Sequence, residues 1–280
     1  MGADYAPESV GRPLCGPRWR LVMPHDTAAI MLHSAGWNRP VNTRSYPVPM
    51  RVFGHRGAAG HCPENTLAGL RHAIALGVDA VEIDVRRLHD ALIVLHDDTL
   101  DRTTNGHGNY KAMTVAALRA LDAGQGERIP LLEEVIALTR GRVELNIEVK
   151  EAGIAEWVVE RTLLATSALP AWRQHILLSS FDVATSAALA SLRGTMRFGL
   201  LYEEKFESAL QRALRLGARS LHMALENLAA ADVACAHEHD LAVYVYTVND
   251  AAAITRCRDA GVNGVFSDYP DRVLAARHDG

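Results

Sequence analysis

The chain has 280 residues, of which 33 are acidic and 29 are basic, and its formal net charge at pH 7 is −4. Nearly half of the residues, 49%, are hydrophobic, so the chain is long and apolar enough to bury one large core. The lysines and arginines are scattered and form no basic stripe, which argues against nucleic acid as a partner.

The first 50 residues differ in composition from the rest of the chain. They are rich in proline, glycine and arginine and show no sustained period. We expect residues 1–50 to form an extension that is poorly ordered or partly packed on a folded domain of residues 51–280. The apolar run LVMPHDTAAIML is interrupted by its PHD segment, so we expect neither export nor a membrane span.

The four cysteines are Cys15, Cys62, Cys235 and Cys257, and they lie far apart in the sequence. They form no Cys-x-x-Cys pair and no dense framework, so neither a zinc knuckle nor a disulfide scaffold is indicated. We therefore expect free thiols and a cytoplasmic location.

From Arg51 onward, short apolar runs of strand length alternate with stretches rich in alanine and leucine that have helical character. The strand-like runs are RVFGHRG, AVEIDVRRL, RVELNIEVK, ILLSSF, RFGLLY, SLHMAL, AVYVYTV and GVFSDYP. Eight strands alternating with helices predict an α/β fold of the (β/α)₈ TIM-barrel type. The interval before RVELNIEVK is longer than one helix needs, so we expect a distorted barrel.

That interval begins with an extra strand, LIVLHD, at residues 92–97. It follows AVEIDVRRL after only three residues, whereas a parallel crossover needs a dozen or more. The extra strand must therefore turn back as an antiparallel hairpin. With the turn centred on Asp90, His96 would lie opposite Asp84.

Acidic residues recur at every second position near the ends of two predicted strands. Glu82 and Asp84 share one face of a strand, and Asn146, Glu148 and Lys150 repeat this spacing on the next one. We expect these side chains to point into the barrel. Buried carboxylates without a partner cost several kcal/mol each, so their convergence suggests a cation or a substrate between them.

The first predicted strand ends in GHRG, where Gly54 and Gly57 allow a tight turn around His55 and Arg56. TIM-barrel active sites lie at the carboxyl ends of the strands, where these residues and the acidic group fall. Several carboxylate oxygens suit one hard divalent cation, Mg²⁺ or Ca²⁺, better than zinc.

Two histidines beside such a cation could divide the work of general base and general acid. His55 and His96 are the candidates, while Arg56 and Lys150 could neutralise a phosphoryl group. A structural network in which Glu82 and Asp84 pair with Arg86 or Arg87 is the alternative.

A set of motifs resembles the glycerophosphodiester phosphodiesterase family, in the phospholipase C-like phosphodiesterase superfamily. The matching pieces, in the family's order and spacing, are GHRG at 54–57, PENT at 63–66, EIDV at 82–85, LHDDTLDRTTNGHG at 95–108, IEVK at 147–150, YTVN at 246–249 and SDYP at 267–270. The resemblance runs from about Arg51 to the C-terminus.

The resemblance implies a distorted TIM barrel that cleaves a small glycerophosphodiester to glycerol 3-phosphate and an alcohol with a bound divalent cation. By this resemblance the cation ligands would be Glu82, Asp84 and Glu148, the acid and base would be His55 and His96, and the phosphate would be held by Arg56 and Lys150. The charge distribution and the short apolar runs already argue against nucleic acid and a membrane span, and the oligomeric state stays open.

Two positions depart from the family pattern. Many members have tryptophan where this chain has Tyr246, which we expect to line the substrate site. A tyrosine there is smaller and adds a hydroxyl, which could alter the wall against glycerol or the headgroup. The family's Thr-x-Asp-Gly hairpin is replaced here by the residues LHDA at 88–91.

Several other polar residues have simpler interpretations. Glu64 and Asn65 are expected to begin a helix, and the loop from Arg102 to Gly108 to support the rim of the site. Asp268 could contribute to the rim or could end the last strand in a turn. The histidines expected to have structural roles are His61, His89, His107, His222 and His237.

Alternative functions share parts of this pattern. A phospholipase D-like enzyme or a lyase acting on lysophospholipids would use the same histidines and carboxylates, but it would need an exposed apolar rim. A non-catalytic phosphodiester-binding barrel would be expected to lack a member of that set. A sugar-processing barrel would not require two histidines and Arg56.

Overall fold

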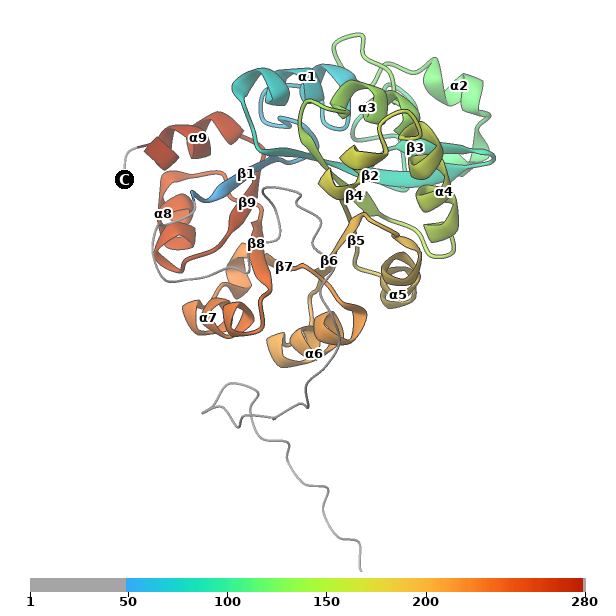
Figure 1. Ribbon diagram of the computed structural model, residues 1–280. Coiled ribbons are helices and arrows are strands. Elements are labelled where there is room, and N and C mark those ends of the chain that lie inside the picture. The colour runs from blue at the N-terminus through green and yellow to red at the C-terminus, as the bar shows by residue number, and fades with distance from the viewer. Residues whose placement is uncertain (1–48, 279–280) are drawn as a thin grey trace, which may run out of the picture.

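The computed structural model describes residues 49–278. Eight parallel strands form a barrel, which is closed because β1 pairs with both β2 and β9. Helices pack around the outside of the barrel (Figure 1). The barrel strands are β1 (Arg51–Gly54), β2 (Ala80–Leu88), β4 (Glu144–Val149), β5 (Ile176–Ser180), β6 (Arg197–Leu201), β7 (Ser220–Ala224), β8 (Ala242–Tyr246) and β9 (Gly264–Ser267). The predicted (β/α)₈ barrel is confirmed.

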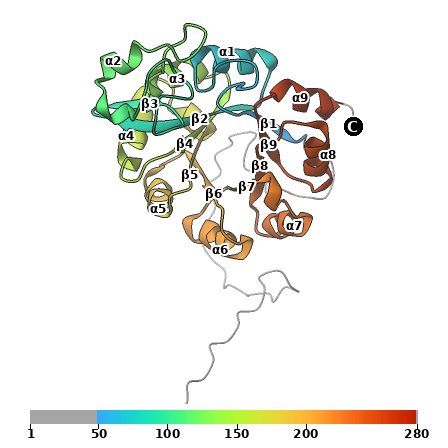
Figure 2. The same cartoon turned by 180° about the vertical axis from the view of Figure 1, so that it is seen from behind.

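The helices form the outer layer, as the view from behind also shows (Figure 2). They are α1 (Leu67–Leu76), α2 (Val115–Arg119), α3 (Leu132–Thr139), α4 (Ala155–Ala165), α5 (Val183–Leu192), α6 (Phe206–Leu216), α7 (Ala230–Glu238), α8 (Ala251–Asp259) and α9 (Pro270–His278), with 3₁₀ turns η1 (Tyr110–Ala112), η2 (Pro170–His175) and η3 (Leu225–Asn227). None of the helices between residues 49 and 278 combines the length and apolar character needed to cross a bilayer.

Strand β2 shows how the alternation of side chains separates the core from the site. Val81, Ile83 and Val85 are fully buried in the apolar layer between the barrel and the helices. Glu82 and Asp84 fall between them and therefore point to the opposite face, the barrel interior. The same strand thus anchors the outer core and presents two carboxylates to the inside.

Aromatic side chains fill the barrel below the carboxylates. The ring of Phe53 lies 4.8 Å from that of Tyr244 and 4.7 Å from that of Phe266, measured between centroids. His222 packs beside Tyr244 and Phe266, and its Nε2 lies 2.8 Å from the hydroxyl of Ser220. Burial lowers the pKa of His222 to about 3, so this ring is a neutral part of the packed interior.

The extra strand β3 (Ala91–Val94) pairs antiparallel with β2, as expected, and the hairpin extends beyond the ring of strands in Figure 1. The expected register is wrong by one residue. Leu88 pairs with Ala91, so the turn contains two residues, and the φ of His89 is 55°. Continuing the ladder brings Leu95 rather than His96 beside Asp84, whose carbonyl accepts from the Leu95 amide at 3.0 Å.

The segment between β3 and β4 packs together with Leu88 of β2 and Ile93 of β3 around a second, small hydrophobic core. This insert core consists of Leu88, Ile93, Leu95, Leu100, Tyr110, Leu118, Ala123 and Ile129. It is separate from the main core between barrel and helices. The loop that carries His96 is therefore held by a local unit as well as by the barrel.

Two further expectations have different outcomes. Cys62 and Cys257 are free thiols, but Cys235 is disulfide-bonded, so the expectation of free thiols is wrong for Cys235. The expected N-terminal extension lies outside the described residues, apart from Pro49 and Met50.

The turn after β1 allows a test of close packing. Gly57 and Gly126 both have positive φ, 91° and 79°. A Cβ at Gly57 would lie 2.7 Å from the Gly69 carbonyl carbon, whereas a Cβ at Gly126 would meet nothing within 4 Å. Gly126→Ala should therefore lower the free energy of unfolding by about 1–2 kcal/mol. Gly57→Ala should cost roughly 1–3 kcal/mol more. Urea denaturation measures both, and equal losses would contradict the close approach.

Candidate active site

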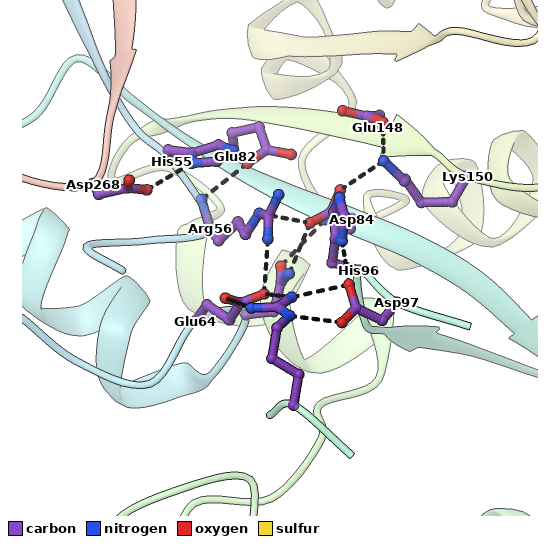
Figure 3. A network of polar contacts seen from close by, with 12 residues as sticks. His55, Arg56, Glu64, Glu82, Asp84, His96, Asp97, Glu148, Lys150 and Asp268 are labelled. Carbon is purple, nitrogen blue, oxygen red and sulfur yellow. Dashed lines mark hydrogen bonds and ion pairs between the residues drawn. The ribbon is translucent and has the colours of Figure 1, made fainter. Parts of the chain in front are cut away.

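A cavity of about 210 Å³ opens at the carboxyl ends of the barrel strands. It contains a network of polar contacts that Figure 3 shows from close by. The predicted site residues that line this cavity are His55, Arg56, Glu82, His96, Glu148, Lys150 and Tyr246. Asp84 lies beside them and is only 1% exposed. The structure thus brings together residues that are up to 191 positions apart in the sequence.

Three carboxylates form the centre of the site. Glu82, Asp84 and Glu148 each offer an oxygen atom, and these atoms lie within 4.8 Å of one another. The register of the parallel pair β2 and β4 explains this proximity, because it places Asp84 directly beside Glu148. We name these residues the acidic triad.

The acidic triad has a strongly perturbed protonation equilibrium. Burial and then the charge of Asp84 raise the pKa of Glu82 to about 8. The same two causes raise the pKa of Glu148. Burial would also raise the pKa of Asp84, but Arg56 and Lys150 outweigh it and hold that pKa below its usual range. The triad therefore has more negative charge than its protein environment stabilises.

Two cationic side chains flank the acidic triad. The Nζ of Lys150 lies 2.6 Å from a Glu148 oxygen and 3.5 Å from an Asp84 oxygen. The Nε of Arg56 lies 3.3 Å from Asp84, and the Arg56 backbone N–H donates to Glu82 Oε2 at 2.9 Å. Both cations come from strand ends, so they can meet a phosphate at the mouth of the barrel.

The acidic triad fits a divalent cation. Glu82 Oε1 is buried and has no hydrogen-bond partner among the residues that the structure describes. Such an orphan acceptor is costly unless something else binds it. The three carboxylates supply only oxygen ligands, which suit Mg²⁺ or Ca²⁺ rather than zinc.

Each predicted catalytic histidine is oriented by an aspartate. His55 Nδ1 lies 2.7 Å from Asp268 Oδ1, and His96 Nδ1 lies 2.5 Å from Asp97 Oδ1. Asp268 is itself held by Asn249, whose side-chain amide donates at 2.7 Å. A carboxylate at Nδ1 fixes the orientation of an imidazole and leaves Nε2 as the nitrogen available to a substrate. Asp268 therefore belongs to the site.

The two imidazoles differ in proton affinity. Burial lowers the pKa of His55, but the hydrogen bond to Asp268 and the charge of Glu82 outweigh it, and the net pKa is raised. For His96 burial prevails, and the pKa is lowered despite the charge of Asp84. A pair of groups with pKa values moved apart is suited to acid and base roles in one reaction.

The residues of the PENT motif do more than begin a helix, which corrects their expected role. The N-cap of α1 is Thr66, whose hydroxyl accepts from the Gly69 amide. Asn65 instead donates to Asp84 Oδ2 at 2.8 Å, and Glu64 accepts from Arg56 at 2.8 Å. The motif alone gave no signal of this, because both partners come from other parts of the chain.

Tyr246 lines the cavity mainly with its ring. The ring meets that of Phe181 edge-on at 5.9 Å, and the hydroxyl donates to the carbonyl oxygen of Tyr202 at 3.4 Å. Burial raises the pKa of the Tyr246 hydroxyl. Tyr246 therefore contributes an apolar wall, and its polar end is directed to the backbone.

Comparisons with known proteins agree with this geometry. The model of the glycerophosphoryl diester phosphodiesterase family matches residues 55–272. A glycerophosphodiester phosphodiesterase of Caldanaerobacter subterraneus subsp. tengcongensis is 33% identical over 232 residues, which cover 80% of this chain and 96% of that protein. A Bacillus subtilis glycerophosphodiester phosphodiesterase is 30% identical over 80% of this chain and 85% of its own length.

Solved structures show the same similarity. An Oleispira antarctica phosphodiesterase, determined in complex with the product sn-glycerol-3-phosphate, aligns with a TM-score of 0.74 at 29% identity, covering 82% of this chain and 97% of the other. The Thermotoga maritima glycerophosphodiester phosphodiesterase aligns with a TM-score of 0.69 at 27% identity, covering 81% and 98%.

The acidic triad can be tested without an activity assay. Glu148→Gln removes one charge of the triad, so affinity for Mg²⁺ or Ca²⁺ measured by calorimetry should fall roughly 10–100-fold. Glu156→Gln, on the exposed first turn of α4, is the matched control and should bind the ion as the unchanged protein does. Equal affinity of the Glu148→Gln protein would remove Glu148 from the ligand set.

Proposed function

Because the chain belongs to the glycerophosphoryl diester phosphodiesterase family, we propose that it hydrolyses a small glycerophosphodiester, such as glycerophosphocholine, to glycerol 3-phosphate and an alcohol. The main support is the convergence of His55, His96 and the acidic triad on one cavity. The product bound in the Oleispira antarctica relative supports glycerol 3-phosphate as the product here.

Arg56 and Lys150 would bind the phosphate of the substrate. Both side chains line the cavity, and both already lie beside carboxylates that they only partly neutralise. A phosphodiester carries one negative charge, which a guanidinium and an ammonium can meet with charge-assisted hydrogen bonds. This placement would hold the phosphorus atom over the acidic triad.

Glu82, Asp84 and Glu148 would hold one divalent cation, Mg²⁺ or Ca²⁺. Such an ion would supply positive charge that polarises a phosphoryl oxygen. The protein contributes the buried oxygen ligands and, through Arg56 and Lys150, the cationic groups that limit repulsion within the triad.

The two histidines would move the protons. Hydrolysis forms a bond from phosphorus to an incoming oxygen and breaks the bond to the alcohol oxygen. One proton must therefore leave the incoming oxygen, and another must reach the leaving oxygen. His55 and His96 can divide these tasks through their Nε2 atoms, because Asp268 and Asp97 hold the Nδ1 atoms. Tyr246 and Phe181 would pack against the carbon atoms of the substrate.

The proposed reaction is tested by the release of glycerol 3-phosphate from glycerophosphocholine and glycerophosphoethanolamine, measured with a coupled enzymatic assay. Release should stop when EDTA removes divalent cations and return when Mg²⁺ or Ca²⁺ is added in excess. Failure to release glycerol 3-phosphate from either diester under any metal condition would overturn the proposal.

The proton-transfer roles are tested by His55→Ala and His96→Ala. Each change should lower kcat by about 10²–10⁴-fold if the ring transfers a proton in the rate-limiting step. His107→Ala is the control, because its side chain is 86% exposed and its partner within residues 49–278 is Asp101 on the same loop. Thermal melting checks that every variant is folded. Unchanged kcat in a folded His55→Ala or His96→Ala protein would exclude the role of that residue.

A further inference from the structure

Arg102 lies outside the cavity and yet is bonded to both sides of the site. Its side chain, on the loop after β3, is 48% exposed. It donates to the two oxygens of Glu64 at 2.6 and 2.8 Å and to the two oxygens of Asp97 at 2.6 and 2.9 Å. One guanidinium therefore joins two carboxylates that come from different segments.

Each of these carboxylates also makes a hydrogen bond with a different residue of the site. Asp97 holds Nδ1 of His96, and Glu64 accepts from Nη1 of Arg56 at 2.8 Å. One branch from Arg102 thus ends at a proposed proton-transfer residue. The other ends at a proposed phosphate ligand.

The geometry differs from that of an ordinary surface ion pair, whose contribution is about 0–1 kcal/mol. Glu64 and Asp97 are only 16% and 23% exposed, and Arg102 contacts both oxygens of each. The planar fork of a guanidinium can meet two carboxylates in fixed directions, whereas an ammonium cannot. The hydrogen bonds from Arg102 also hold the pKa of Asp97 far below its usual range.

Without Arg102, Glu64 and Asp97 would lose the cation that lies between them. Two carboxylates that share a cation repel each other when it is removed. Each would then move to other partners or to water. His96 would lose the carboxylate at its Nδ1, and Arg56 would lose Glu64 while keeping its contact with Asp84. Misplacement by about 1 Å is enough to lower a rate roughly 10²-fold.

We propose that Arg102 is a positioning residue, which sets the orientations of His96 and Arg56 together by way of Asp97 and Glu64. This inference rests on the proposed function, because His96 and Arg56 act in that reaction. It gives a specific role to one residue of the loop from Arg102 to Gly108, which was expected from the sequence to support the rim of the site.

The test compares Arg102→Ala with Arg119→Ala in the release of glycerol 3-phosphate from glycerophosphocholine. Arg119 is the matched control, because it makes the same two-bond fork with Glu134, at 2.5 and 2.8 Å, away from the cavity. Arg102→Ala should lower kcat roughly 10–100-fold, the scale for groups that orient functional residues. Arg119→Ala should leave kcat unchanged.

Two further measurements separate positioning from a general loss of structure. Guanidinium ions can be added far below the concentration that unfolds the protein. They should restore part of the kcat of Arg102→Ala, because the Arg102 side chain that they replace is half exposed. They should not raise the kcat of His96→Ala. Arg102→Lys keeps the charge but not the fork, so it should recover only part of kcat. Full activity of Arg102→Lys would overturn the role of the fork.

The outcomes also separate this inference from the proposed function. If the unchanged protein releases no glycerol 3-phosphate, the proposed function fails. If the unchanged protein is active and folded Arg102→Ala has the same kcat, the positioning role fails. If Arg102→Ala does not fold, the test rests on Arg102→Lys. A kcat of Arg102→Lys equal to that of the unchanged protein would then overturn the inference.

Discussion

The mutual repulsion of three clustered carboxylates, two of them buried and one half-buried, is the constraint on which the site depends. Glu82, Asp84 and Glu148 are fixed by the register of adjoining strands, so they cannot separate without breaking the barrel. Arg56 and Lys150 stabilise the charge of Asp84, yet Glu82 retains a raised pKa and an orphan oxygen. The remaining excess of negative charge makes the cavity suited to an ion and, through the flanking cations, to a phosphate.

The sequence was sufficient to predict the barrel, and to predict that most of the candidate residues lie together, for a simple physical reason. Apolar runs of strand length separated by helical stretches permit few folds, and the link before the extra strand is too short for a parallel connection. The spacing of Glu82 and Asp84 then required a shared face, and the proximity of their oxygen atoms in the acidic triad agrees with it. These inferences concern neighbours along the chain, where geometry is nearly fixed.

The sequence could not give contacts that depend on turn conformation or on distant segments. The positive φ of His89 fixes a two-residue turn and moves His96 by one position in the hairpin register. Asn65 lies beside Asp84 only after α1 has packed on the barrel, so a capping role was the reasonable local interpretation. The aspartate partner of His55, Asp268, is 213 residues away.

The insert core, which includes Ile93 and Tyr110, is packed separately from the main core and from the aromatic cluster inside the barrel. The acidic triad stands on the barrel sheet, whereas His96 stands on a loop that the insert helps to hold. Substitutions at the insert-core residues after β3 can accumulate while the strands that carry Glu82 and Glu148 stay as they are. The position of the His96 loop can therefore change through the insert core while the carboxylates of the acidic triad keep their spacing.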